Sequence, residues 1–170
     1  MEPNQTSEPW LRGTLIDIPV VPRAVFHALE LAQEDLDRWC RSLSDAELNT
    51  RPLGLAPIAF HVRHIARSLD RLLTYAEGDQ LNGEQIAKMK SELDAAAKHD
   101  ELFEELKAAL HKSAQRIRAF DVTRLDDHRE VGQKKLPTTL GGLLVHIAEH
   151  TQRHVGQAIT TSKIVLAQRS

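Results

Sequence analysis

The sequence predicts an all-α fold, and more specifically a four-helix bundle. Three observations predict it: four long stretches carry apolar residues at helical spacing, proline and glycine punctuate the segments between them, and no stretch shows convincing strand alternation. The chain has 170 residues, 41% of them hydrophobic and 27% charged, which is typical of a globular protein with a sizeable core. We therefore expect one domain over residues 1–170.

The first half of the chain is expected to hold an arm and two long helices. Residues 1–21 are interrupted by prolines and predict an irregular N-terminal arm. Residues 23–41 carry apolar side chains at helical spacing and predict the first helix. After a polar break and a turn, the second helix is expected to begin near Pro57, because proline suits a first helical turn, and to stop at Gly78.

The second half is expected to hold the other two long helices. Residues 79–90 predict a short helix or an ordered connection, and residues 91–120 predict the third long helix. Residues 121–136 are polar and charged, with no helical period, so no helix is assigned to them. The last helix is expected over residues 140–166, with a threonine of the run Pro137–Thr139 as its N-cap.

Charge and composition narrow the function classes. The chain has 22 Lys and Arg against 24 Asp and Glu, a formal net charge of −2, so no basic field indicates nucleic acid or an anionic membrane. No apolar run approaches the roughly 20 residues of a membrane span, and the N-terminal run MEPNQTSEPW lacks the regions of a signal peptide. Cys40 is the single cysteine, which excludes an internal disulfide, and we expect it to pack in the core. These features favour a cytoplasmic protein.

Three histidines at four-residue intervals are the strongest chemical signal of the chain. His146, His150 and His154 lie in the run LLVHIAEHTQRHVGQ. A helix turns about 100° per residue, so a four-residue step returns to nearly the same face about 6 Å further along. Imidazoles at that spacing can bind one divalent metal. His146 and His154 would lie about 12 Å apart along the axis, too far to share an ion, so His150 would pair with one of them.

The second predicted helix carries a further pair, His61 and His64, in the run FHVRHIARS. Inward-facing side chains on different helices of a bundle can converge on one site. Three imidazoles around one cation leave a position open for water or substrate, which is typical of a catalytic site rather than a closed structural one. The residues alone leave open which histidine of each helix binds the metal.

Two well-known classes of metal site do not fit these histidines, whereas two interpretations without catalysis do. The run His146–His150 has the HxxEH form of inverted zinc peptidases, but no acidic residue follows it to serve as the further ligand. Ferritin-like di-iron bundles need ExxH pairs, and no histidine here follows an acidic residue by three positions. Two interpretations without catalysis stay open: a metal-stabilised dimeric bundle or small-molecule sensor, and a metal-free, pH-responsive histidine ladder.

The final helix resembles a family signature. The segment HTQRHVGQ resembles the HxxxHxGQ pattern of the DinB-like (YfiT-like) superfamily, and IAFHVRHIARSLDRL resembles that superfamily's second helix, which supplies the other histidine. The resemblance covers most of the chain and implies an up-down-down-up four-helix bundle with a divalent metal at one end, often as a homodimer. Carried over by position, the metal ligands fall on His64, His150 and His154, with His61 and His146 as alternates or pocket-lining residues. The surplus of histidines leaves room for a shifted triad of His61, His146 and His150.

The resemblance also implies a range of activities. Characterised relatives include thiol-dependent S-transferases that use bacillithiol and mycothiol-dependent isomerases, and some members are described as metal-dependent hydrolases. We therefore expect a metal-dependent enzyme of hydrolase or thiol S-transferase type, acting on a small-molecule substrate. No cysteine of the chain suits the role of nucleophile, so any thiol would be a low-molecular-weight cofactor. Zinc is favoured as the metal, and nickel, iron and cobalt also suit three imidazoles.

Four further side chains are candidates for catalytic or binding roles because each lies within one turn of a predicted ligand. Ser68 is expected to touch the pocket, and Gln157 to donate a hydrogen bond to a ligand or the substrate. Arg153, like Arg67, is a candidate for binding a substrate carboxylate. Glu149 adjoins a predicted ligand but points about 100° away from it, so a solvated or ion-paired role is expected.

Overall fold

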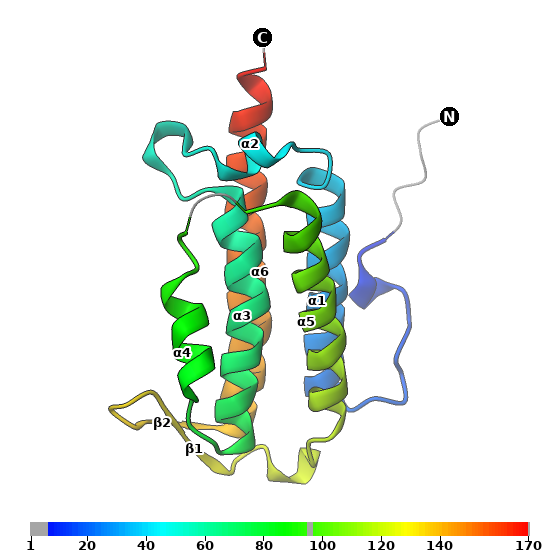
Figure 1. Cartoon of the computed structure of the whole chain (residues 1–170). Helices are drawn as coiled ribbons and strands as arrows, with labels where there is room; N and C mark the ends of the chain where they lie inside the picture. The colour runs from blue at the N-terminus through cyan, green and yellow to red at the C-terminus, as the bar shows by residue number, and fades with distance from the viewer. Residues whose placement is uncertain (1–6, 95–96, 170) are drawn as a thin grey trace.

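Four long helices run side by side along most of the molecule (Figure 1). The computed structural model describes residues 7–94 and 97–169. Its long helices are α1 (Val20–Trp39), α3 (Ile58–Glu77), α5 (His99–Arg118) and α6 (Leu140–Ala167). Helices α1 and α6 run in one direction, and α3 and α5 run in the other. Helix α6 packs along both α1 and α3, and α3 packs along α5, whereas α1 and α5 touch loosely.

Helix α3 has the ends that the sequence predicted. Pro57 precedes its first residue, and Gly78 follows its last with a left-handed φ of 95°, which closes the helix without a Cβ penalty. Its core-facing side chains recur at helical spacing and are fully buried: Ile58, Val62, Ile65, Leu69 and Leu73. The opposite side of the helix carries polar residues, so α3 has a defined inner face on which the position of each histidine depends.

The N-terminal arm is tied to α1. Helix α1 begins at Val20, three residues before the predicted start. In the described part of the arm, Pro9–Leu11 form a 3₁₀ turn. The guanidinium of Arg12 then donates to Glu30 at 2.9 Å and to Glu34 at 2.6 Å, both on α1. The predicted irregular arm thus contains one helical turn, and its residues 1–6 lie outside the described residues.

Two short helices lie between the long ones, α2 (Asp45–Asn49) and α4 (Gly83–Lys90). Each begins with a capping box, in which the N-cap side chain and the third residue satisfy one another's backbone amides. Helix α4 fits the short helix expected over residues 79–90. The prediction that the next helix begins at residue 91 is wrong, since α5 begins at His99. Residues 91–94 instead form part of a linker along α3, and residues 95–96 are outside the described ranges.

A small hairpin corrects the all-α prediction. Strand β1 (His128–Val131) pairs antiparallel with β2 (Leu136–Thr139), and Val131 lies opposite Leu136 across the turn. Neither strand alternates between buried and exposed residues, so the period of two that marks a strand in a sequence is missing. Thr139 ends β2 and also caps α6, because its hydroxyl oxygen accepts the amide of Gly142 at 3.0 Å. The fold is therefore mostly helical with a two-stranded sheet, and the predicted threonine cap is confirmed.

None of the described helices combines the length and the apolar character that crossing a membrane requires. The core instead lies between the four long helices, and its fully buried side chains include Leu36, Ile65, Leu144 and Ile147. Cys40, directly after α1, belongs to the same core and has no exposed surface. The prediction that Cys40 packs in the core is therefore confirmed.

Burial makes Cys40 a testable marker of that packing. It raises the pKa of the thiol to about 12, so almost no thiolate exists at pH 8. We expect iodoacetamide at pH 8 to leave the folded protein unmodified and to alkylate Cys40 fully after unfolding in guanidinium, as measured by intact mass. Rapid alkylation of the folded protein would show that α1 does not bury this residue.

Candidate metal centre

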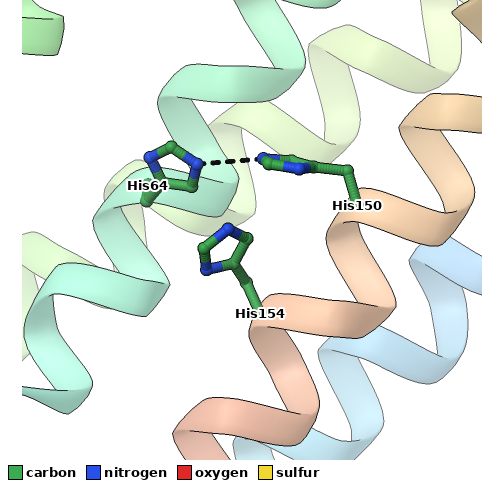
Figure 2. Close-up of side chains that lie close together, drawn as sticks. All are labelled: His64, His150 and His154. Atoms are coloured by element: carbon green, nitrogen blue, oxygen red, sulfur yellow. Dashed lines mark hydrogen bonds between the residues drawn. The ribbon is translucent and has the colours of Figure 1, made fainter. Parts of the chain in front are cut away.

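Three imidazoles from two helices meet between α3 and α6 (Figure 2). His64 comes from α3, and His150 and His154 come from successive turns of α6. One ring nitrogen of each lies within 4.8 Å of the other two, and all three residues are half-buried. The closest approach joins Nε2 of His64 and Nε2 of His150, which are 2.9 Å apart. The structure thus brings together the three residues on which the family pattern fell.

The local structure of α6 explains the position of its two histidines. Ile147, Thr151 and Val155 recur every four residues and form a buried stripe against the neighbouring helices. His150 and His154 each precede a member of that stripe by one residue, so they lie about 100° around the helix, at the border between core and solvent. Side chains at this border keep part of their surface exposed, as the intermediate burial of both histidines shows.

Glu92 supports His64 from behind. Its Oε2 lies 2.6 Å from Nδ1 of His64, and its Oε1 accepts from Nη1 of Arg71 at 2.5 Å. Burial alone would raise the pKa of Glu92, but the hydrogen bonds from His64 and Arg71 lower it, so the group is a carboxylate at neutral pH. A carboxylate only accepts hydrogen bonds, so Nδ1 of His64 carries the proton. In the neutral form of this ring, the lone pair is then on Nε2, the nitrogen that lies 2.9 Å from His150.

His61 takes the corresponding place behind His154. The two Nδ1 atoms lie 3.1 Å apart, and His61 is buried. Because Nδ1 of His154 is engaged there, Nε2 is the nitrogen that points toward His64 and His150 (Figure 2). The ring of Phe60 stacks on His64 with centroids 5.3 Å apart and also meets the edge of His154 at 6.2 Å. One side of the cluster is thus covered by an aromatic ring.

The electrostatics of the cluster suit a cation. Burial, and then proximity to His64, lowers the pKa of His61 to about 4, of His150 to about 4 and of His154 to about 3. These imidazoles are therefore uncharged at neutral pH, which is the state that binds metal. Zinc–nitrogen bonds of about 2.0–2.1 Å in tetrahedral geometry separate ligand nitrogens by about 3.3 Å. The nitrogen separations of the cluster, from 2.9 Å to less than 4.8 Å, include this value.

The other predicted residues have contacts of their own. Ser68 is buried and its hydroxyl donates to the carbonyl of Ile65 in the same helix, at 3.1 Å. Arg153 is exposed and lies 3.3 Å from Glu149, and Gln157 is exposed on α6. Arg67 donates to Glu105 at 2.8 Å. None of these hydrogen bonds is made to His64, His150 or His154, although the charge of Arg153 helps to lower the pKa of His150 and His154.

His146 lies at the margin of the cluster. Its Nδ1 is 2.8 Å from Glu149, and its ring is 5.3 Å from that of His150. Glu149 therefore has the solvated or ion-paired role that was expected of it, with Arg153 as its ion-pair partner and a hydrogen bond to His146.

Sequence reasoning missed Glu92, Arg71 and Phe60. Phe60 directly precedes His61, and its aromatic ring gave no sign that it would stack on an imidazole one turn away. Glu92 is 28 residues from His64 and stands in a segment that the periodicity assigned to a helix. The available signal was the repeat of arginine every four residues along α3, which indicates that a segment rich in acceptors packs on that side.

Comparison with known proteins bears on the fold. The sequence model of the DinB superfamily matches residues 28–158 of this chain. No protein of curated function matches it. A crystal structure described as a conserved protein from Enterococcus faecalis aligns with 89% of this chain and 100% of its own, with a TM-score of 0.72 and 19% sequence identity. At that identity the likeness concerns the fold alone.

Proposed function

The chain belongs to the DinB superfamily, and we propose that it is a metal-dependent enzyme whose divalent cation is held by His64, His150 and His154. One observation carries the proposal: three imidazole nitrogens from two helices converge at a half-buried point. Among the described residues no fourth His, Cys, Asp or Glu joins this cluster. Three protein ligands are the number that leaves a coordination position for water or substrate.

In this proposal the cation supplies the chemistry, and the side chains around it orient and cover its ligands. A cation bound to three neutral imidazoles keeps its charge and lowers the pKa of a bound water or thiol. Glu92 and His61 orient His64 and His154, and Phe60 covers one side of the rings.

Three candidates remain for contact with substrate. Arg153 is exposed and makes one long contact with Glu149, so its guanidinium can turn to a substrate carboxylate without breaking a buried pair. Gln157 is also exposed and free to donate to a substrate. Ser68 would first have to release the Ile65 carbonyl. Arg153 is therefore the first of the three to substitute in an activity screen.

The reaction class follows from the nucleophile that the centre would activate. Water gives a hydrolase, and a thiol gives an S-transferase, in each case with a small-molecule substrate. The thiol would be a low-molecular-weight cofactor, because Cys40 is buried and its pKa is raised. We favour zinc for its open tetrahedral sites, with nickel, iron or cobalt as alternatives. The up-down-down-up bundle topology, the homodimer and the cytoplasmic location are proposed from the family resemblance and the composition.

Cobalt substitution tests whether the centre is open. We expect the visible absorption bands of the cobalt(II) form, prepared from protein without an affinity tag, to shift when azide is added, because azide would occupy the free coordination position. The same protein, after a chelator has removed its cobalt, serves as the blank. A metal that only stabilises a dimer or a sensor would have all its coordination positions filled, so azide could not bind to it. Bands that azide leaves unchanged would therefore contradict the enzyme proposal.

A further inference from the structure

Glu92 is an unusual residue for a linker. It follows α4 and lies outside every helix, yet its side chain is only 6% exposed. Both carboxylate oxygens are used, one by Nδ1 of His64 at 2.6 Å and the other by Arg71 at 2.5 Å. A buried charge is costly unless it is paired and hydrogen-bonded, so the fold must hold this carboxylate in place.

Three arginines of α3 hold the linker, and we call them the arginine ladder: Arg63, Arg67 and Arg71. Arg63 donates to the carbonyls of Glu92 at 3.2 Å and Asp94 at 3.0 Å. Arg67 donates to the carbonyl of Lys88 at 2.8 Å and to the hydroxyl of Ser91 at 3.0 Å. The backbone on both sides of Glu92 is thus fixed to the helix that carries His64.

The ladder explains how a linker residue can be placed as accurately as a helical one. Its members are four residues apart, so they share one side of α3 and meet successive parts of the linker. His64 follows Arg63 directly and lies next to this side. The carboxylate is therefore held against His64 from three points, two through the backbone and one through Arg71.

We propose that Glu92 is a positioning residue of the metal centre, which holds His64 in its Nδ1–H tautomer and so presents the Nε2 lone pair to the cation. The inference rests on the proposed metal-dependent function. With the proton on Nε2 instead, the nitrogen that lies 2.9 Å from His150 would be unable to bind metal. A carboxylate on the second nitrogen also fixes the plane of the ring and makes the ligand more basic.

The two supported ligands differ in charge. His154 is backed by the neutral ring of His61, whereas His64 is backed by a full negative charge. The attraction of that charge for a divalent cation acts across one imidazole, in a partly buried site where screening by water is reduced. Loss of the Glu92 charge should therefore weaken metal binding even when the shape of the side chain is kept.

Glu92→Gln tests this, with Glu105→Gln as the matched control. Glutamine keeps the size of the side chain but removes the charge and puts a donor beside His64. Glu105 is the carboxylate partner of Arg67, so its substitution disturbs the same ladder without touching His64 Nδ1. In chelator competition on tag-free protein, we expect Glu92→Gln to weaken zinc binding about 10- to 100-fold, and Glu105→Gln to change it by less than about 3-fold.

The tautomer of His64 is a second readout, and it is measured on the wild type rather than on Glu92→Gln. Long-range ¹H–¹⁵N NMR of the metal-free wild type, assigned with His64→Gln, is expected to show the proton on Nδ1. A proton on Nε2, or equal zinc affinity in Glu92→Gln and the wild type, would overturn this inference alone. A wild type that binds no zinc would instead overturn the metal-dependent function, and the inference with it.

Discussion

Replacing His150 by alanine is expected to weaken zinc binding by about 10²- to 10³-fold. Structural zinc sites bind with about 10–16 kcal/mol over four ligands, so one imidazole contributes roughly 2.5–4 kcal/mol. His150 lies next to both other members of the cluster, because its Nε2 is 2.9 Å from that of His64 and its ring is 4.6 Å from that of His154. Chelator competition on protein purified without an affinity tag measures the change.

Other histidine variants make this result specific. His128 lies on β1 with 66% of its side chain exposed, so His128→Ala should bind zinc as the wild type does. His61→Ala should weaken binding about 10-fold, since it removes only the support behind His154. Equal affinity in all the variants would remove the cluster as a metal site. A loss in His146→Ala as large as that in His150→Ala would favour the shifted triad.

The helix ends that could be predicted were marked by local signals. Pro57 and Gly78 bound α3 because each fixes a backbone conformation by its own covalent structure. Thr139 caps α6 for a similarly local reason, through an amide three residues away. Such signals are readable without knowledge of the rest of the fold.

The elements that sequence reasoning missed depend on distant contacts. Residues 128–139 form a hairpin whose strands have four residues each and no alternating burial, so pairing rather than pattern defines them. The start of α5 was predicted too early because residues 91–94 continue a helix-like composition. Their backbone is instead bound by Arg63 and Arg67, which no local signal in the linker reveals.

The candidate metal centre also depends partly on local signals and partly on contacts between distant residues. The four-residue step between His150 and His154 is a property of one helix, and it indicated a shared ligand face. The choice of His64 over His61 needed the family pattern, because three residues along a helix leave both rings near the neighbouring helix. The structure places His61 behind His154, and His64 within the three-histidine cluster. Glu92 could not be predicted, because it lies beside His64 only through the folding of the linker along α3.

Leu144→Ala is expected to cause the largest loss of stability that we predict, about 2–5 kcal/mol in the free energy of unfolding of the metal-free protein. Leu144 has no exposed surface and lies on α6, the helix that packs along both α1 and α3. Its truncation leaves a cavity that the long helices cannot close by moving independently. Since each kcal/mol shifts the melting temperature of a domain this size by roughly 2–4 °C, thermal unfolding with the chelated protein measures the effect.

Val145→Ala is the matched control, one residue further along the same helix. Its side chain is 56% exposed, so the change should alter stability by no more than about 0.5 kcal/mol. Leu144→Ala should also keep its zinc affinity while it is folded, because no ligand or ligand support is altered. His150→Ala should give the reverse pattern, with weaker binding and little change in metal-free stability, since its ring lies at the border of the core. If both variants lost stability and affinity together, the centre would depend on the packing of the whole of α6 rather than on the imidazoles themselves.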